Sequence, residues 1–149
     1  MGGIRTWQGK QLFFHDPPAG VMKQELNCIM LIDNNPDDNF YHQRVIRKFN
    51  ASIQVIVFTT AIGALNHLLS AEKNIVQPKL IFLDINMPGM NGWDFMEVFQ
   101  ADPGHSAETK IIVLTTSENP DDRRKALAYT AIADFMTKPL TMEKLGLVL

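Results

Sequence analysis

The 149-residue sequence contains a single cysteine, so an intramolecular disulfide framework is excluded. That residue, Cys28, heads an apolar run, which is typical of a small buried core residue. The four histidines are His15, His42, His67 and His105, and their scattered positions lack the paired spacing of a transition-metal site. The cysteine count suits a reducing compartment, and we expect a cytoplasmic protein.

The sequence also lacks an excess of either charge and any long apolar run. Its 14 basic and 16 acidic residues leave a net charge of -2. Such a balance provides no strong electrostatic attraction to nucleic acid or to a membrane surface. No apolar run approaches the ~20 residues of a membrane-spanning helix. We therefore expect no direct binding to nucleic acid or membrane, and a hydrophobic content of 46% suits one globular domain.

The first 24 residues lack the hydrophobic periodicity of the remainder. They contain Gly2-Gly3 and Pro17-Pro18, and their one apolar cluster is too short for a signal peptide. We predict a disordered or loosely packed tail over residues 1–24, followed by one domain over residues 25–149. Met22 is a candidate natural start, in which case the earlier residues come from an expression vector or an upstream reading frame.

Five apolar runs alternate with five helical patterns from Cys28 onward. The predicted strands are 28–33, 52–58, 80–84, 110–115 and 133–136. Helices are predicted to begin after Asn35, Thr60, Asn91, Asn119 and Thr141. This alternation predicts an α/β fold, a doubly wound five-stranded parallel sheet with helices on both faces. Residues 141–149 allow only about 14 Å of final helix, so we expect that helix to be truncated or to end early.

Three of the predicted helices carry an apolar stripe that we expect to face the sheet. The stripes are Tyr41, Val45, Ile46 and Phe49, then Ile62, Leu65, Leu68 and Leu69, and finally Phe95, Met96 and Phe99. The helix that follows Asn119 has few apolar residues, and we expect it to pack lightly and to present an exposed face.

Polar side chains follow four of the five predicted strands. The first strand ends in Asp33-Asn34, the third in Asp84, the fourth in Thr115-Thr116, and the fifth leads into Lys138. Any one of them has an ordinary structural reading, such as a turn cap or a partner in an ion pair. The carboxyl ends of parallel strands meet at one edge of the sheet, where open α/β folds hold their ligands. The common position of these side chains therefore predicts a ligand-binding site at this edge.

The residue types at this edge suit magnesium and phosphoryl transfer. Carboxylate and amide oxygens are hard ligands for Mg²⁺, so Asp33 and Asn34 would hold the metal, with a backbone carbonyl near Asn86 as a further ligand. Asp84 is the candidate nucleophile toward phosphorus, because it lies on the middle strand. Lys138 would neutralise phosphoryl oxygens, and Thr115 would donate a hydrogen bond to one of them.

The chain from about Glu25 to Leu149 resembles the receiver domain of two-component response regulators. Four motifs carry this resemblance in order and spacing: Leu31–Asp38, Leu83–Gly92, Val113–Ser117 and Asp134–Leu140. The resemblance implies a flavodoxin-like fold with strand order 2-1-3-4-5.

The resemblance also implies a role for each matching residue. It makes Asp84 the phosphoacceptor and assigns Mg²⁺ to Asp33, Asn34, Asp84 and the backbone carbonyl of Asn86. The phosphoryl contacts would be Thr115, the backbone of Thr116, and Lys138. Thr115 and Phe135 would form the switch, and Lys138-Pro139 would be a cis peptide.

The implied partners are proteins of a phosphorelay. The phosphoryl donor would be a sensor histidine kinase or a histidine phosphotransfer protein. An effector protein would bind the face formed by the fourth helix, fifth strand and fifth helix. Such a receiver is a signalling domain and not an enzyme, although it promotes its own phosphorylation and dephosphorylation.

One position departs from the usual receiver pattern of two adjacent acids after the first strand. The second position is Asn34, so the pocket has one negative charge fewer, and we expect weaker Mg²⁺ affinity. This departure leaves open a pseudo-receiver that binds partners without phosphorylation. A phosphatase of the haloacid dehalogenase type is a further alternative, but it needs a second acid where this chain has Asn86. Asn86 and Ser117 occupy positions that tune phosphate lifetime in receivers.

Overall fold

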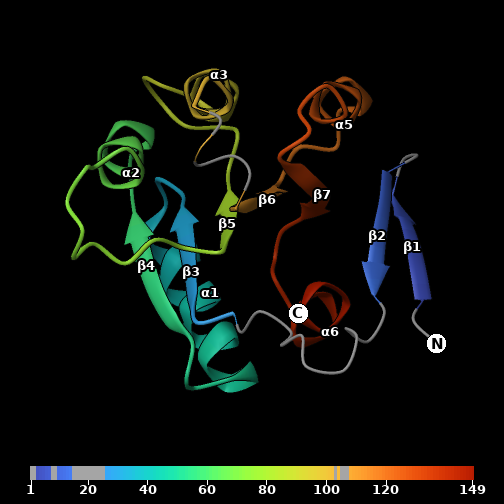
Figure 1. Ribbon diagram of the computed structural model, residues 1–149. Coiled ribbons are helices and arrows are strands. Elements are labelled where there is room, and N and C mark those ends of the chain that lie inside the picture. Colours follow the sequence, from blue (N-terminus) through green and yellow to red (C-terminus); the bar gives the residue numbers. More distant parts are fainter. Residues whose placement is uncertain (1–2, 8–9, 15–25, 103, 105–107) are drawn as a thin grey trace.

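The computed structural model describes residues 3–7, 10–14, 26–102, 104 and 108–149. The strands of its main sheet are β3 (Cys28–Ile32), β4 (Gln54–Phe58), β5 (Leu80–Leu83), β6 (Lys110–Thr115) and β7 (Ile132–Thr137). They lie in the order β4-β3-β5-β6-β7, and every neighbouring pair is parallel. Numbered within this sheet, the order is 2-1-3-4-5, so the predicted topology is confirmed (Figure 1).

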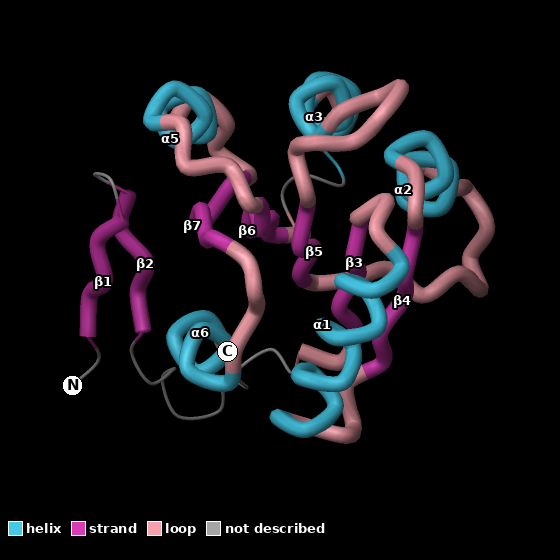
Figure 2. Tube along the Cα trace, turned by 180° about the vertical axis from the view of Figure 1, so that it is seen from behind, coloured by secondary structure: helices cyan, strands magenta, loops and turns pink. Residues whose placement is uncertain are grey.

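Helices cover both faces of the sheet. The described helices are α1 (Pro36–Phe49), α2 (Ala61–Leu68), α3 (Gly92–Gln100), α5 (Pro120–Ala126) and α6 (Met142–Val148). Helices α1 and α6 lie on one face, and α2, α3 and α5 lie on the other (Figures 1 and 2). The prediction of a doubly wound sheet is therefore confirmed.

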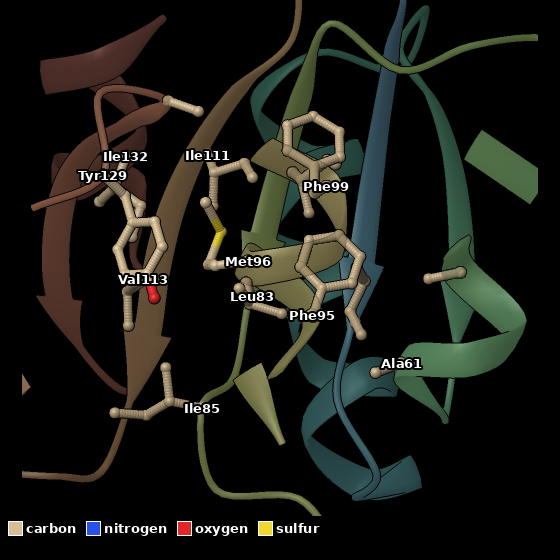
Figure 3. Close-up of a cluster of buried hydrophobic side chains, with 14 of the residues drawn as sticks. Ala61, Leu83, Ile85, Phe95, Met96, Phe99, Ile111, Val113, Tyr129 and Ile132 are labelled. Carbon is tan, nitrogen blue, oxygen red and sulfur yellow. The ribbon is translucent and has the colours of Figure 1, made fainter. Parts of the chain in front are cut away.

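Two hydrophobic cores fill the spaces between the sheet and its helices. Along β3, Met30 and Ile32 belong to the core under α2, α3 and α5, whereas Ile29 and Leu31 belong to the core under α1 and α6. Figure 3 shows the first of these cores, which includes Phe95, Met96 and Phe99 of α3 together with Leu83, Ile111 and Val113. Because both faces are buried, the strands read as continuous apolar runs in the sequence.

The helix starts follow from local side-chain chemistry. The Asn35 side chain accepts hydrogen bonds from the backbone N–H groups of Asp37 and Asp38, and Asn119 caps α5 in a similar way. Asn91 and Asp94 form a reciprocal capping box at the start of α3. Such caps depend only on residues within one turn, so they can be recognised in the sequence. All the predicted helix starts are confirmed.

The buried faces of two helices differ from the predicted stripes. In α1, Tyr41 is 49% exposed and the buried residues are Asn39, His42 and Ile46. In α2, the predicted burial is confirmed for Leu65 and Leu68 and is wrong for Ile62 and Leu69, which are exposed. Hydropathy alone places polar side chains in water, so it misses a helix whose inner face carries polar groups. The inward face predicted for α3 is confirmed.

The loop between β5 and α3 requires glycine at two positions. Gly89 has a φ of 72°, a conformation that glycine adopts without strain. A Cβ atom on Gly92 would lie 2.6 Å from the Cα of Ile85 and 2.9 Å from the carbonyl oxygen of Asp84. Gly92 thus lets the start of α3 approach the end of β5 closely, which shapes the loop that follows Asp84.

A separate two-stranded antiparallel sheet lies within the segment predicted to be a tail. Its strands are β1 (Gly3–Trp7) and β2 (Lys10–Phe14), with Gly3 opposite Phe14 and Trp7 opposite Lys10. No strand is predicted for these residues from the sequence, and the division into a tail over residues 1–24 and a domain over residues 25–149 stays a prediction. The other residues of that segment, 1–2, 8–9 and 15–24, lie outside the described part. In the described residues, no helix has the length and apolar character needed to cross a membrane.

Candidate functional site

The polar groups predicted to share the carboxyl edge of the sheet do come together there. Asp33 follows β3, Asp84 follows β5, Thr115 ends β6, and Lys138 follows β7. Asp33 is 5% exposed, Asp84 is 6% exposed and Thr115 is fully buried. Buried polar groups need partners, since an unpaired charge away from water is strongly unfavourable. The contacts among these side chains therefore define the site.

The Lys138 ammonium is the centre of this cluster. Its Nζ lies 2.6 Å from Asp33 Oδ2, 2.8 Å from Asp38 Oδ2 and 3.2 Å from Asp84 Oδ2. The Lys138 side chain is 9% exposed. One cation thus pairs with three carboxylates, and the cluster carries a net negative charge in a site largely shielded from water.

Backbone N–H groups orient the two central carboxylates. The N–H of Asn35 donates to Asp33 Oδ1 at 2.9 Å, and the N–H of Asn86 donates to Asp84 Oδ1 at 3.1 Å. The Oδ2 atoms of both residues face Lys138. Each carboxylate is therefore held on one oxygen by the following loop and on the other by the lysine.

Burial and charge shift the titration of this cluster. Burial raises the pKa of Asp33, and its hydrogen bonds with Lys138 and with the N–H of Asn35 oppose that change. For Lys138, burial alone would lower the pKa. The hydrogen bonds to Asp33 and Asp38 and the charge of Asp84 outweigh burial, and the pKa of Lys138 lies above its ordinary value. The ammonium therefore stays protonated at neutral pH.

Asp38 is the site residue that the sequence analysis did not identify. By its sequence position it is an acidic residue in the first turn of α1, where the helix dipole favours negative charge. In the structure its carboxylate accepts a hydrogen bond from Lys138, which lies 100 residues away in the sequence. The sequence does contain a signal for Asp38. It lies in the first turn of the helix that follows Asp33, which places it at the same carboxyl edge of the sheet.

Asn34 follows Asp33 directly in the chain, and Asn86 lies two residues after Asp84. Both asparagines are exposed, and Thr116 is exposed as well. Asn86 Nδ2 lies 3.5 Å from Thr115 Oγ1, a long hydrogen bond that connects the loops after β5 and β6. These asparagines are therefore accessible from solvent, whereas the carboxylates of Asp33 and Asp84 keep only a small exposed fraction.

The Thr115 hydroxyl is connected to the start of α5. Its Oγ1 accepts a hydrogen bond from the N–H of Ser117 at 3.2 Å. The Ser117 hydroxyl in turn donates to Asp122 Oδ2 at 2.5 Å, in the first turn of α5. Movement of Thr115 would therefore disturb this helix through two hydrogen bonds.

Phe135 is buried on β7 beneath α5. The residue is 4% exposed, and the Arg123 guanidinium carbon lies 5.1 Å from its ring centroid. Phe135 is thus in an inward position, covered by a cation from α5. The adjacent Lys138-Pro139 peptide is cis, in agreement with the prediction.

The donor groups at this edge suit a small divalent cation. Asp33 and Asp84 offer buried carboxylates, and the neighbouring residue Asn34 is exposed. Among the described residues, no three His, Cys, Asp or Glu side chains are arranged as a complete metal site. Oxygen ligands from two carboxylates, completed by amide, backbone and water oxygens, are the set that Mg²⁺ accepts.

A cavity of about 10 Å³ is lined in part by the two carboxylates. Besides Asp33 and Asp84, its walls include Asn39 and His42 of α1. Such a volume holds about one water molecule. This cavity is too small for an organic substrate.

Fold and site together define a flavodoxin-like α/β domain with an acidic pocket closed by a lysine. The family model of the response regulator receiver domain matches residues 29–149. The chain belongs to this family, whose members are signalling domains of two-component systems.

Known proteins agree with this assignment. The chain is similar to the probable C4-dicarboxylate response regulator DctR of Halalkalibacterium halodurans, with 28% identity over 125 residues. The match covers 84% of this chain and 50% of DctR, so the chain spans half the length of that relative.

Solved structures show the same fold. A two-component response regulator from Cytophaga hutchinsonii has a TM-score of 0.75 and 29% identity, covering 83% of this chain and 93% of that chain. The Mn²⁺-bound form of response regulator Rcp1 has a TM-score of 0.68 and 24% identity, covering 80% and 86% respectively.

Proposed function

We propose that Asp84 accepts a phosphoryl group from a phosphohistidine of a sensor histidine kinase or a histidine phosphotransfer protein. The observation that carries this proposal is the contact between Asp84 Oδ2 and Lys138 Nζ at 3.2 Å at the carboxyl edge of the sheet. In the transfer, a carboxylate oxygen of Asp84 attacks phosphorus and forms the P–O bond. The P–N bond breaks, and the imidazole leaves and takes up a proton from solvent.

The surrounding residues stabilise the charge that this step moves onto the pocket. Lys138 pairs with the phosphoryl oxygens, and the Thr115 hydroxyl and the backbone of Thr116 donate hydrogen bonds to them. Asp33, Asn34, Asp84 and the backbone carbonyl of Asn86 would hold Mg²⁺. When bound, this ion supplies further neutralisation of the phosphoryl charge. The Mn²⁺-bound form of Rcp1 supports a divalent cation here.

Output is proposed to depend on Thr115 and on Phe135, which lies buried beneath α5. When Thr115 turns toward the phosphoryl group, Ser117 loses its acceptor and α5 shifts. The face formed by α5, β7 and α6 then changes its affinity for an effector protein. The same pocket promotes hydrolysis of the aspartyl phosphate, which resets the domain. The free cysteine suits a reducing compartment, so we place this exchange in the cytoplasm.

The second candidate is a pseudo-receiver, which binds partners without phosphorylation. The observation that favours it is that Asn34, an exposed amide, follows Asp33, where one more carboxylate would strengthen metal binding. Lys138 also already pairs with the carboxylates that a metal needs.

Addition of beryllofluoride and Mg²⁺, followed by an amide NMR spectrum, distinguishes the two functions. A phosphorylatable receiver should show shifts around Asp84 and along β6 and β7, and the Asp84→Asn variant should show none of them. An unchanged wild-type spectrum at saturating Mg²⁺ would favour the pseudo-receiver.

A further inference from the structure

The inner face of α1 is unusually polar for a helix packed on a sheet. Asn39 and His42 are each 3% exposed, and both are polar residues. Asp38 lies beside them and reaches Lys138. Buried polar groups persist where they make hydrogen bonds, so each of these side chains should hold a specific partner.

His42 contacts the backbone of the turn that follows β7. Its Nε2 lies 3.3 Å from the backbone nitrogen of Leu140, which donates the hydrogen bond. A ring nitrogen that accepts a hydrogen bond carries no proton, so His42 is the neutral tautomer with its proton on Nδ1. Leu140 itself is fully buried, and water therefore offers its N–H no alternative acceptor.

The position of His42 on α1 connects this hydrogen bond to the phosphoacceptor site. Asp38 and His42 are four residues apart, so they lie one above the other on the same side of the helix. Asp38 accepts from Lys138 Nζ while His42 accepts from the N–H of Leu140, two residues farther along the turn. On the other side, Lys144 of α6 donates to the carbonyls of Thr137 and Pro139.

We propose that His42 is a positioning residue that holds the turn of residues 137–140 against α1 and thereby fixes the Lys138 ammonium beside Asp84. This inference rests on the proposed function, because it concerns how Lys138 is placed for the phosphoryl group. Without an acceptor at His42 Nε2, the buried N–H of Leu140 must find another partner, and the turn moves. Lys138 then leaves the point between Asp33, Asp38 and Asp84.

Two substitutions of similar polarity test this role. In His42→Gln the amide oxygen can occupy the place of Nε2, whereas in His42→Asn it reaches only the place of Nδ1. With Mg²⁺ and a small acyl phosphate as donor, we expect the Gln variant to be phosphorylated within about twofold of the wild-type rate. The Asn variant should be slower by about tenfold or more, as for residues that orient a ligand from behind. Equal losses in both variants would overturn the proposal.

Two measurements without phosphodonor keep this test independent of the proposed function. The ring nitrogens of wild-type His42 should show the tautomer protonated on Nδ1, and the opposite tautomer would contradict the proposal. The Lys138 ammonium signal should shift in His42→Asn and stay in place in His42→Gln. A further outcome is that the wild-type protein is not phosphorylated while the Lys138 signal shifts in His42→Asn and not in His42→Gln. In that case the positioning role stands and the proposed function fails.

Discussion

At the scale of single residues, one ammonium pairs with three carboxylates. Lys138 lies within 3.2 Å of Asp33, Asp38 and Asp84, and its side chain is almost fully buried. An attraction of this kind only offsets the cost of removing the charges from water. Loss of the cation would leave that cost uncompensated, so Lys138 contributes to stability as well as to the proposed chemistry.

The variant Lys138→Met should lose about 3 kcal/mol of unfolding free energy in the presence of EDTA, because buried carboxylates lose their counter-charge. Millimolar Mg²⁺ should restore part of this loss, since a second cation can take the same place. Urea unfolding with and without Mg²⁺ measures both effects. The exposed Lys48→Met is the matched control, and an equal loss in that variant would contradict the role of the ion cluster.

A second prediction at this scale concerns Asn34. In Asn34→Asp, a carboxylate replaces an exposed amide beside Asp33, so Mg²⁺ should bind more tightly by at least about 1 kcal/mol, roughly fivefold. Calorimetric or fluorescence titration with Mg²⁺ measures the change. Equal affinities in the two proteins would show that position 34 contributes no charge to the metal site.

At the scale of secondary-structure elements, α5 is held mainly by side chains at its ends and flanks. Among its described residues, Ala126 is buried, while Lys125 lies 5.2 Å from the ring centroid of Trp93. Just after the helix, Tyr129 stacks on Trp93 at 5.9 Å and donates a hydrogen bond to Glu97 of α3. The predicted light packing of this helix is confirmed. Such an element can shift without unfolding the sheet.

This arrangement predicts a difference between two substitutions of Tyr129. Tyr129→Leu removes the aromatic stack and should cost about 2 kcal/mol, from the ring pair and the lost buried area. Tyr129→Phe keeps the stack and should cost less than about 1 kcal/mol. Hydrogen exchange should accelerate in α5 of the Leu variant and remain unchanged in β3 and β5. Equal hydrogen-exchange rates in α5 of the two variants would show that the stack of Tyr129 on Trp93 does not hold this helix in place.

At the scale of the whole molecule, the sheet separates two hydrophobic cores, and the polar groups of the candidate site lie at its carboxyl edge. Residues from β3, β5, β6 and β7 meet at that edge, and α1 adds polar groups from one side. Polar contacts that hold the site also connect distant parts of the chain. The global stability of the fold should therefore respond to the titration of its buried groups.

The pH dependence of unfolding should reveal His42. Burial lowers its pKa to about 4, below the ordinary value of 6.5. Between these values the unfolded chain binds more protons than the folded one, so stability falls as pH falls. The contribution of His42 is about 1.4 kcal/mol per pH unit in this window. Urea unfolding from pH 7 to pH 4.5 should show a weaker decline in His42→Gln, and parallel curves would contradict the shifted pKa.

The sequence was sufficient for much of the fold because the relevant signals are local. Helix starts depend on caps such as Asn35 and Asn119, within one turn of the groups that they satisfy. The strands buried on both faces appear as unbroken apolar runs. Because parallel strands end at a common edge, Asp33 and Asp84 could be placed together without coordinates. The hairpin of β1 and β2 carried no comparable signal, and it was not predicted.

The amino-acid sequence by itself determined the order of strands and helices, the helix caps and the group of polar residues at the strand ends. Only the tertiary structure decided which of these groups touch. It brought Asp38 to Lys138 across 100 residues and paired His42 with the N–H of Leu140 across 98. Hydropathy assigns such side chains to solvent, because their burial becomes favourable only when folding supplies a charged or hydrogen-bonding partner from a distant segment.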